Sequence, residues 1–205
     1  MMKIFRSILG LMTLGMVFAA KAQQIPVNRC GTMTVLQAAM EKDPDLMERY
    51  EKIKLQLSQD VKTKLTNPAA RENAASVFIP VVFHIVMNDP TQVTDAQIMA
   101  QVTALNNDYA GLNADSTVIP AAFKPLFGKS KIQFVLAKRT AGNLPSNGIE
   151  RIVTTQSVFG IGNTSIKYTA SGGADSWDPS RFFNVWICQL TDGLLGYATL
   201  SLIHI

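Results

Sequence analysis

The amino-acid sequence predicts an α/β domain, a mixed sheet backed by a helix, that follows a shorter helical segment. Two long apolar runs, FIPVVFHIVM over residues 78–87 and FFNVWICQ over residues 182–189, are rich in β-branched and aromatic residues, as is typical of buried strands. An amphipathic helix and short alternating runs lie between them. This order of strand, helix and further strands indicates the α/β class.

The first 22 residues have the pattern of a cleaved signal peptide. Lys3 and Arg6 precede an apolar run over residues 8–18, and Ala20-Lys21-Ala22 forms a small-x-small cleavage site. An uncleaved membrane anchor is the alternative, but the run is short for a bilayer span. We therefore expect cleavage after Ala22 and a secreted or periplasmic protein, with no stable membrane insertion once the signal has been removed.

Removal of the signal changes the charge balance. The whole sequence has 19 Lys and Arg against 15 Asp and Glu, but Lys3, Arg6 and Lys21 leave with the signal. The remainder is nearly neutral, so the pI of about 9.1 is not evidence for nucleic-acid binding. We expect no nucleic-acid partner.

Residues 23–75 are predicted to be a helical segment that ends in a linker. One helix is expected from about Thr32 to Lys42, and a second starts at Asp43-Pro44, with Asp43 as N-cap. An apolar stripe follows on the second helix, and it is too small to form a core alone, so we expect it to lie against another part of the protein. Its members are Leu46, Tyr50, Ile53, Leu57, Val61 and Leu65. Residues 67–73 (NPAAREN) read as the linker.

The elements of the α/β part follow in order over residues 76–199. Thr94 to Gln97 fits a capping box, and apolar residues at helical spacing continue to Leu112. Further strands are expected over 131–138, 149–155 and 193–199, with turns at 146–148 and 191–193 and a loop at 171–175.

Seven stretches, in this order and spacing, resemble the pappalysin family of metzincin metallopeptidases. They are IPVVFHIV at 79–86, LNAD at 112–115 with PAAF at 120–123, IQF at 132–134, GIER at 148–151, KYTASGGADSW at 167–177, NVWIC at 184–188 and LLGYA at 194–198. The resemblance covers about residues 77–199 and implies the N-terminal half of a zinc metalloendopeptidase domain that acts on proteins or peptides.

The zinc motif of that family, HExxHxxGxxH, is absent from this sequence. The chemistry needs three histidines and a glutamate, whereas the sequence has only His84 and His204. The resemblance therefore implies zinc ligands downstream of this chain, and it admits calcium as a further cofactor. Residues 200–205 depart from the family pattern, and we interpret them as the tail of a truncated reading frame.

Cys30, in the run Arg29-Cys30-Gly31-Thr32, resembles the cysteine switch of metzincin pro-segments. A thiolate there would be an inhibitory zinc ligand in the precursor. A disulfide with Cys188 and an idle thiol are the alternatives. Cys188 lies in an apolar strand, where a buried small hydrophobe is the favoured interpretation.

Leu194, Leu195, Gly196, Tyr197 and Ala198 are the candidate substrate-binding residues. In metzincins an edge strand above the zinc pairs antiparallel with the peptide substrate, and the resemblance implies this role here. An ordinary edge strand is the alternative. His84 is interpreted as a core histidine with a hydrogen-bonded ring. Asp108, Asp115, Asp175 and Asp178 are interpreted as caps and turn formers.

Two hypotheses of different classes follow. The first is the N-terminal fragment of a secreted zinc metalloendopeptidase precursor, or zymogen, with signal peptide 1–22, pro-segment and linker 23–75, half of a catalytic domain over 76–199 and a suspect tail at 200–205. The fragment itself is expected to be inactive. The second is a secreted, non-enzymatic α/β binding module.

Overall fold

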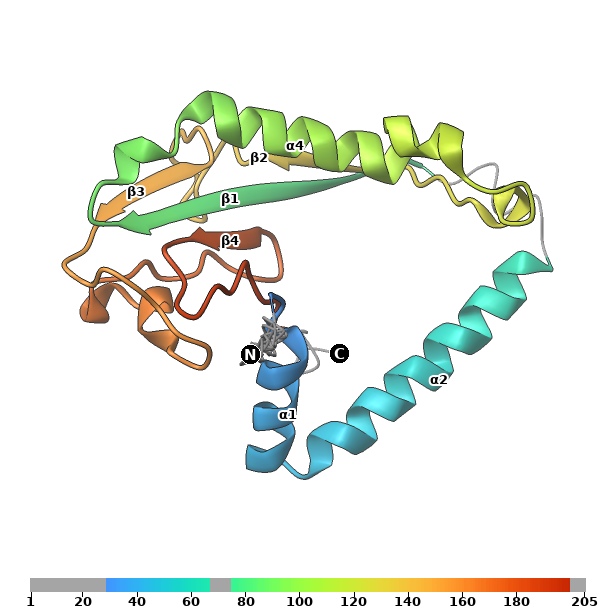
Figure 1. Cartoon of the computed structure of the whole chain (residues 1–205), viewed down its shortest axis with the longest axis horizontal. Helices are drawn as coiled ribbons and strands as arrows, with labels where there is room; N and C mark the ends of the chain where they lie inside the picture. The colour runs from blue at the N-terminus through green and yellow to red at the C-terminus, as the bar shows by residue number, and fades with distance from the viewer. Residues whose placement is uncertain (1–28, 67–74, 200–205) are drawn as a thin grey trace, which may run out of the picture.

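The structure, a computed structural model, describes residues 29–66 and 75–199 (Figure 1). The predicted signal peptide, the linker at 67–73 and the tail at 200–205 lie outside these residues. The helices are α1 (Thr32–Lys42), α2 (Asp45–Leu65) and α4 (Asp95–Ala110), and the strands are β1 (Val77–Met87), β2 (Ile132–Leu136), β3 (Ile149–Val153) and β4 (Phe183–Ile187). Five short 3₁₀ turns are η1 (Pro90–Gln92), η2 (Ala114–Val118), η3 (Lys124–Leu126), η4 (Thr164–Lys167) and η5 (Thr169–Ser171).

The long strand β1 is the centre of the sheet. Its first half pairs with β2 and its second half with β3, while β4 pairs with its middle. The carbonyl of Val81 accepts from Ala137 N, and Phe83 N donates to the carbonyl of Gly148, so β2 and β3 lie in line along one edge of β1. Figure 1 shows them there, with β4 on the opposite side.

Helix α4 covers one face of the sheet. Its N-terminus has the predicted capping box, in which Thr94 Oγ1 accepts from Gln97 N and Gln97 Oε1 accepts from Thr94 N. Ile98 packs on the side chains that alternate on this face of β1, Val81, Phe83 and Ile85. Gly111, with φ of +66°, ends the helix as glycine commonly does.

The opposite face of β1 carries Val82, His84 and Val86, all fully buried. It is covered by irregular chain rather than by a helix. Phe159 and Ile166 pack on Val86, and Phe182 with Trp177 packs on Val82. This face therefore holds a fully buried polar side chain, His84, beneath loops that can bring polar partners to it.

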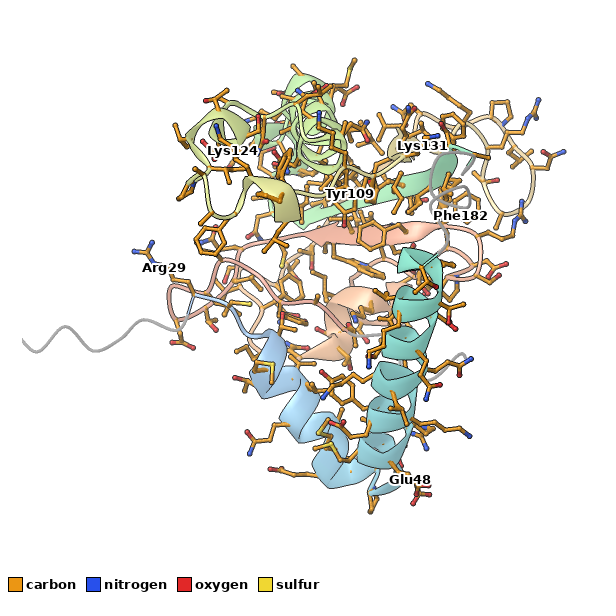
Figure 2. All side chains as sticks on the ribbon, turned by 90° about the vertical axis from the view of Figure 1, so that its right-hand side faces the viewer. Arg29, Glu48, Tyr109, Lys124, Lys131 and Phe182 are labelled. Carbon is orange, nitrogen blue, oxygen red and sulfur yellow. The ribbon has the colours of Figure 1, made fainter. Side chains whose placement is uncertain are left out.

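The leading segment forms a hairpin of α1 and α2 away from the sheet (Figure 1). Glu48 lies near its far tip (Figure 2). Leu36 and Leu46 are buried against each other and form a small cluster. The prediction that the whole apolar stripe is covered is wrong for the described residues, because Leu57 is 61% and Val61 48% exposed.

The predicted N-cap of the second helix is displaced by one residue. Pro44 is the N-cap of α2, and Asp43 instead accepts from Asp45 N and pairs with Arg49. The carboxylate therefore still satisfies a free amide of the first turn.

The α/β fold class is confirmed, and the predicted strands at 78–87, 131–138, 149–155 and 182–189 correspond to β1 to β4. We expected a mixed sheet, with at least one antiparallel strand. The three pairings among these four strands are all parallel. The predicted strand over residues 193–199 is wrong as a regular strand, because Gly196 makes only an isolated bridge. Among the described residues, no helix is long and apolar enough to cross a membrane.

Candidate functional site

The segment Leu194–Ala198, which we call the rim segment, is paired with the start of the leading segment. Leu195 N donates to the carbonyl of Arg29 at 2.9 Å, and Gly31 N donates to the carbonyl of Gly196 at 3.0 Å. The two segments also form an isolated parallel bridge between Cys30 and Gly196. The five residues predicted to bind substrate therefore meet the segment predicted to hold the switch cysteine, although more than 160 positions separate them.

Close packing fixes the leading segment on the rim segment. A Cβ atom at Gly31 would lie 2.8 Å from Ile161 Cδ1 and 3.3 Å from Leu194 Cδ1. Only glycine therefore fits at this position of the leading segment without displacing the neighbouring side chains. Leu194 is buried beneath it, whereas Leu195 is exposed. A Cβ at Gly196 would meet open space among the described residues.

Thr32 ties the cysteine to the rim segment. Its hydroxyl oxygen accepts from Ala198 N at 2.9 Å and lies 3.4 Å from Cys30 Sγ. The side-chain and backbone hydrogen bonds of Thr32 lower the pKa of the exposed Cys30 thiol. Thr32 also begins α1, whose positive dipole end favours an anion at this position. From the sequence, Thr32 was predicted only as the start of a helix, and its position two residues after a cysteine was the available signal for a role beside Cys30.

The two cysteines do not form a disulfide in the structure; both are free. Burial raises the pKa of the Cys188 thiol to about 11, so this group is an un-ionised, half-buried side chain beside Trp186. This agrees with its interpretation as a small hydrophobe. Burial also raises the pKa of Tyr197, within the rim segment.

The described residues do not fit a metal site of either expected kind. No group of three or more His, Cys, Asp or Glu side chains gathers within residues 29–66 and 75–199. Cys30 offers one zinc donor and His84 is held by other partners, while three protein ligands are the usual minimum for catalytic zinc. Asp175 and Asp178 accept from the backbone amides of Thr169 and Ser180, as expected of turn formers.

His84 is the centre of a row of polar side chains across the sheet. It is fully buried, its Nδ1 lies 2.7 Å from Glu150 Oε2, and its Nε2 lies 2.9 Å from Asn184 Oδ1. Its ring stacks on Trp186, with centroids 4.9 Å apart. The prediction of a core histidine with a bonded ring is confirmed. The neighbours of His84 were not predicted from the sequence. Only the strand register places Glu150 of β3 and Trp186 of β4 beside it.

The hydrogen bonds of Asn184 determine the state of the histidine ring. Asn184 Nδ2 donates to the carbonyls of Trp177 and Phe182, and Oδ1 accepts from Trp177 N. The oxygen therefore faces His84, and a carboxylate oxygen faces the other ring nitrogen. The Nε2 atom of His84 donates to Asn184 Oδ1, and the Nδ1 atom is hydrogen-bonded to the carboxyl group of Glu150.

Lys167 connects this row to the rim segment. Its ammonium lies 5.4 Å from the centroid of the Trp186 ring and donates to Thr199 Oγ1 at 2.9 Å. Burial lowers the pKa of Lys167. Thr32 of the leading segment therefore holds the last residue of the rim segment, Ala198, and Lys167 holds the residue after it, Thr199.

Nine solved chains are similar to this one. A promirolysin mutant from Tannerella forsythia shares 32% identity over 84% of this chain and 54% of its own length, with a TM-score of 0.68. Mature mirolysin of the same organism, in complex with a cleaved peptide, shares 38% identity over 62% of this chain and 47% of its own, with a TM-score of 0.58. Mirolysin in complex with a compound shares 39% over 62% and 47%, with a TM-score of 0.59.

These similarities support a metzincin-like fold for the chain, as found in a zinc metallopeptidase and its precursor. The chain spans about half the length of the solved structures that it matches. No family model matches the sequence, and no curated protein matches it either.

Proposed function

We propose that this chain is the N-terminal part of a secreted zinc metalloendopeptidase precursor of the pappalysin family, and that its leading segment blocks the substrate site. The observation that carries the proposal is the pairing of Arg29–Thr32 with the rim segment, Leu194–Ala198. The match to the promirolysin mutant covers more of this chain than the match to mature mirolysin, as expected if residues 29–66 correspond to a pro-segment.

The direction of the pairing explains how the leader would block the site without being cut. A metzincin substrate runs antiparallel to its rim strand, whereas the Cys30–Gly196 bridge is parallel. The leading segment therefore occupies two backbone groups of the rim segment, Leu195 N–H and Gly196 C=O, with its chain direction opposite to that of a substrate. A reversed peptide presents its carbonyl carbon in the wrong orientation for attack by a water on the far side.

Cys30 adds a second inhibitory element. Its thiol is exposed on the described chain and its pKa is lowered, so a larger share is the thiolate that binds zinc. When bound, zinc would supply an activated water for peptide hydrolysis. Because the described residues do not form its site, we assign no reaction step to them, and we place the ligands in a longer protein.

The proposal includes export and processing. Cleavage after Ala22 and a second cut in the linker at 67–73, where Arg71 is a basic cleavage point, would release the catalytic half that begins near residue 76. Peptide or protein substrates would then pair with the vacated rim segment.

A comparison of precursors tests the proposal. The longer protein should encode HExxHxxGxxH within a few dozen residues after Ala198, and its unprocessed Cys30→Ala variant should hydrolyse a reporter peptide faster than the unprocessed parent. After complete processing the two should be equally active, because residue 30 has left. A Cys30→Ala precursor as silent as its parent would show that Cys30 does not act as a switch. A reading frame without a histidine cluster would favour the class of binding modules instead.

A further inference from the structure

The strand β3 has an open outer edge. Phe83 N donates to the carbonyl of Gly148, and Thr154 N donates to the carbonyl of Met87, so the even-numbered residues from 148 to 154 face β1. The parallel ladder therefore turns the carbonyls of Ile149 and Arg151, and the amides of Arg151 and Val153, away from β1. In the part of the chain that the structure describes, β3 pairs with no other strand.

A cavity of about 630 Å³ lies beside this edge. Glu150 and Arg151 both line it, although their side chains leave the strand on opposite faces: Glu150 meets His84, and Arg151 meets Asp95 beside α4. The cavity is lined by three consecutive residues of β3, Glu150, Arg151 and Ile152, so it follows this strand. An extended chain that pairs with the outer edge would lie beside the cavity.

The far wall of the cavity is formed by the segment from Thr169 to Asp178. It contributes the half-buried indole of Trp177 and the exposed carboxylates of Asp175 and Asp178. An aromatic face next to a carboxylate is a suitable environment for a cationic side chain.

The charges around the cavity favour a cation, and Asp175 is the main source. Glu150 is paired with His84, and Arg181 attracts Asp178. Asp175 accepts a hydrogen bond from Thr169 N at 3.0 Å and forms no ion pair with the described residues. The guanidinium of Arg151 is directed away, to Asp95 and the carbonyl of Val93.

We propose that the outer edge of β3, together with this cavity, binds an extended peptide that places a lysine or arginine side chain against Asp175 and Trp177. Backbone hydrogen bonds to Arg151 and Val153 supply the strand pairing, and the cavity supplies the preference for a basic residue. This site lies on the opposite side of β1 from β4, and it does not depend on the proposed peptidase function.

Direct binding to the purified chain tests the proposal. The probes are a short acetylated peptide, TVKVT, and the same peptide with norleucine in place of lysine. We expect the lysine peptide to bind with a Kd below about 1 mM. Its addition should shift the backbone amide NMR signals of Arg151 and Val153 and the indole signal of Trp177, and leave those of the rim segment, Leu194–Ala198, unchanged. The norleucine peptide should bind about fivefold more weakly, and raised salt should remove the difference.

Two pairs of variants separate the edge from the charge. Val153→Pro removes an outward amide without breaking the ladder to β1, so both peptides should lose about tenfold in affinity, whereas Val153→Thr should keep it. Asp175→Asn keeps an acceptor for Thr169 N. It should lower the affinity for the lysine peptide to that for the norleucine peptide. Asp89→Asn is the matched control, because Asp89 accepts from Thr91 N in the same manner and does not line the cavity. This change should leave the affinity for both peptides unaltered.

Several results would overturn the proposal. They are no saturable binding of the lysine peptide, equal affinity for both peptides, or unchanged binding to a Val153→Pro variant whose melting curve is that of the parent. Self-association of the chain that Val153→Pro abolishes, without peptide binding, would assign the edge to a second copy instead. Should Val153→Pro unfold, the Asp175→Asn comparison decides alone.

Discussion

Replacement of His84 by leucine should destabilise the domain strongly. The imidazole is fully buried and makes two hydrogen bonds, to Glu150 at 2.7 Å and to Asn184 at 2.9 Å. Hydrogen bonds to charged groups are worth roughly 1.5–3 kcal/mol each, so the gross loss is about 3–6 kcal/mol. Glu150 is 38% exposed and can regain water, and leucine fills most of the volume, which places the expected net loss near 3 kcal/mol.

Urea unfolding measures this loss, because both tryptophans of the sequence, Trp177 and Trp186, contact the histidine ring. A domain is typically stable by roughly 5–15 kcal/mol, so the shift in midpoint should be large. A double-mutant cycle with Glu150→Leu should give a coupling of about 2 kcal/mol, since each single change leaves the partner without its ion. The long-range NMR spectrum of the ring should show two protected N–H protons.

Three outcomes would refute the reasoning. If the free energy of unfolding of His84→Leu lies within about 1 kcal/mol of that of the parent, the hydrogen bonds of His84 contribute no more to stability than a typical point mutation removes. A coupling near zero would mean that Glu150 does not balance the ring. A single protected ring N–H would mean that the imidazole is neutral and that the second proton of the pair lies on Glu150.

Three further predictions concern the leader and the rim. Thr32→Val should raise the pKa of Cys30, so that iodoacetamide alkylates the thiol more slowly at neutral pH; an unchanged rate profile would show that Thr32 does not act on it. Gly31→Val should displace Ile161 and increase proteolysis of the leading segment, whereas Gly142→Val, where a Cβ would meet only Thr140 Oγ1 at 3.8 Å, should not. Burial lowers the pKa of Lys167, so folding disfavours its charged form below that pKa, and this cost disappears as the pH rises through the folded and then the unfolded pKa. Relative to Lys167→Met, the parent should therefore gain stability from neutral pH to about pH 10, and parallel melting curves across this range would contradict the assignment.

The sequence by itself determined the elements whose cause is local. The apolar runs of β1 and β4, the capping box of Thr94 and Gln97, and the helix Thr32–Lys42 each depend on neighbours within a few positions, and each was found. The shortage of histidine also excluded a three-histidine metal site without any coordinates.

Tertiary structure alone decided which distant residues meet. Only the order of strands around β1 places Glu150 and Asn184 on the two nitrogens of His84, from positions 66 and 100 residues away. Only packing shows that the rim segment, Leu194–Ala198, pairs with the leading segment and does not form a regular strand. The physical reason is that a backbone amide or a carboxylate satisfies its hydrogen bonds with whichever partner the packed core brings within about 3 Å, and no local sequence pattern specifies that partner.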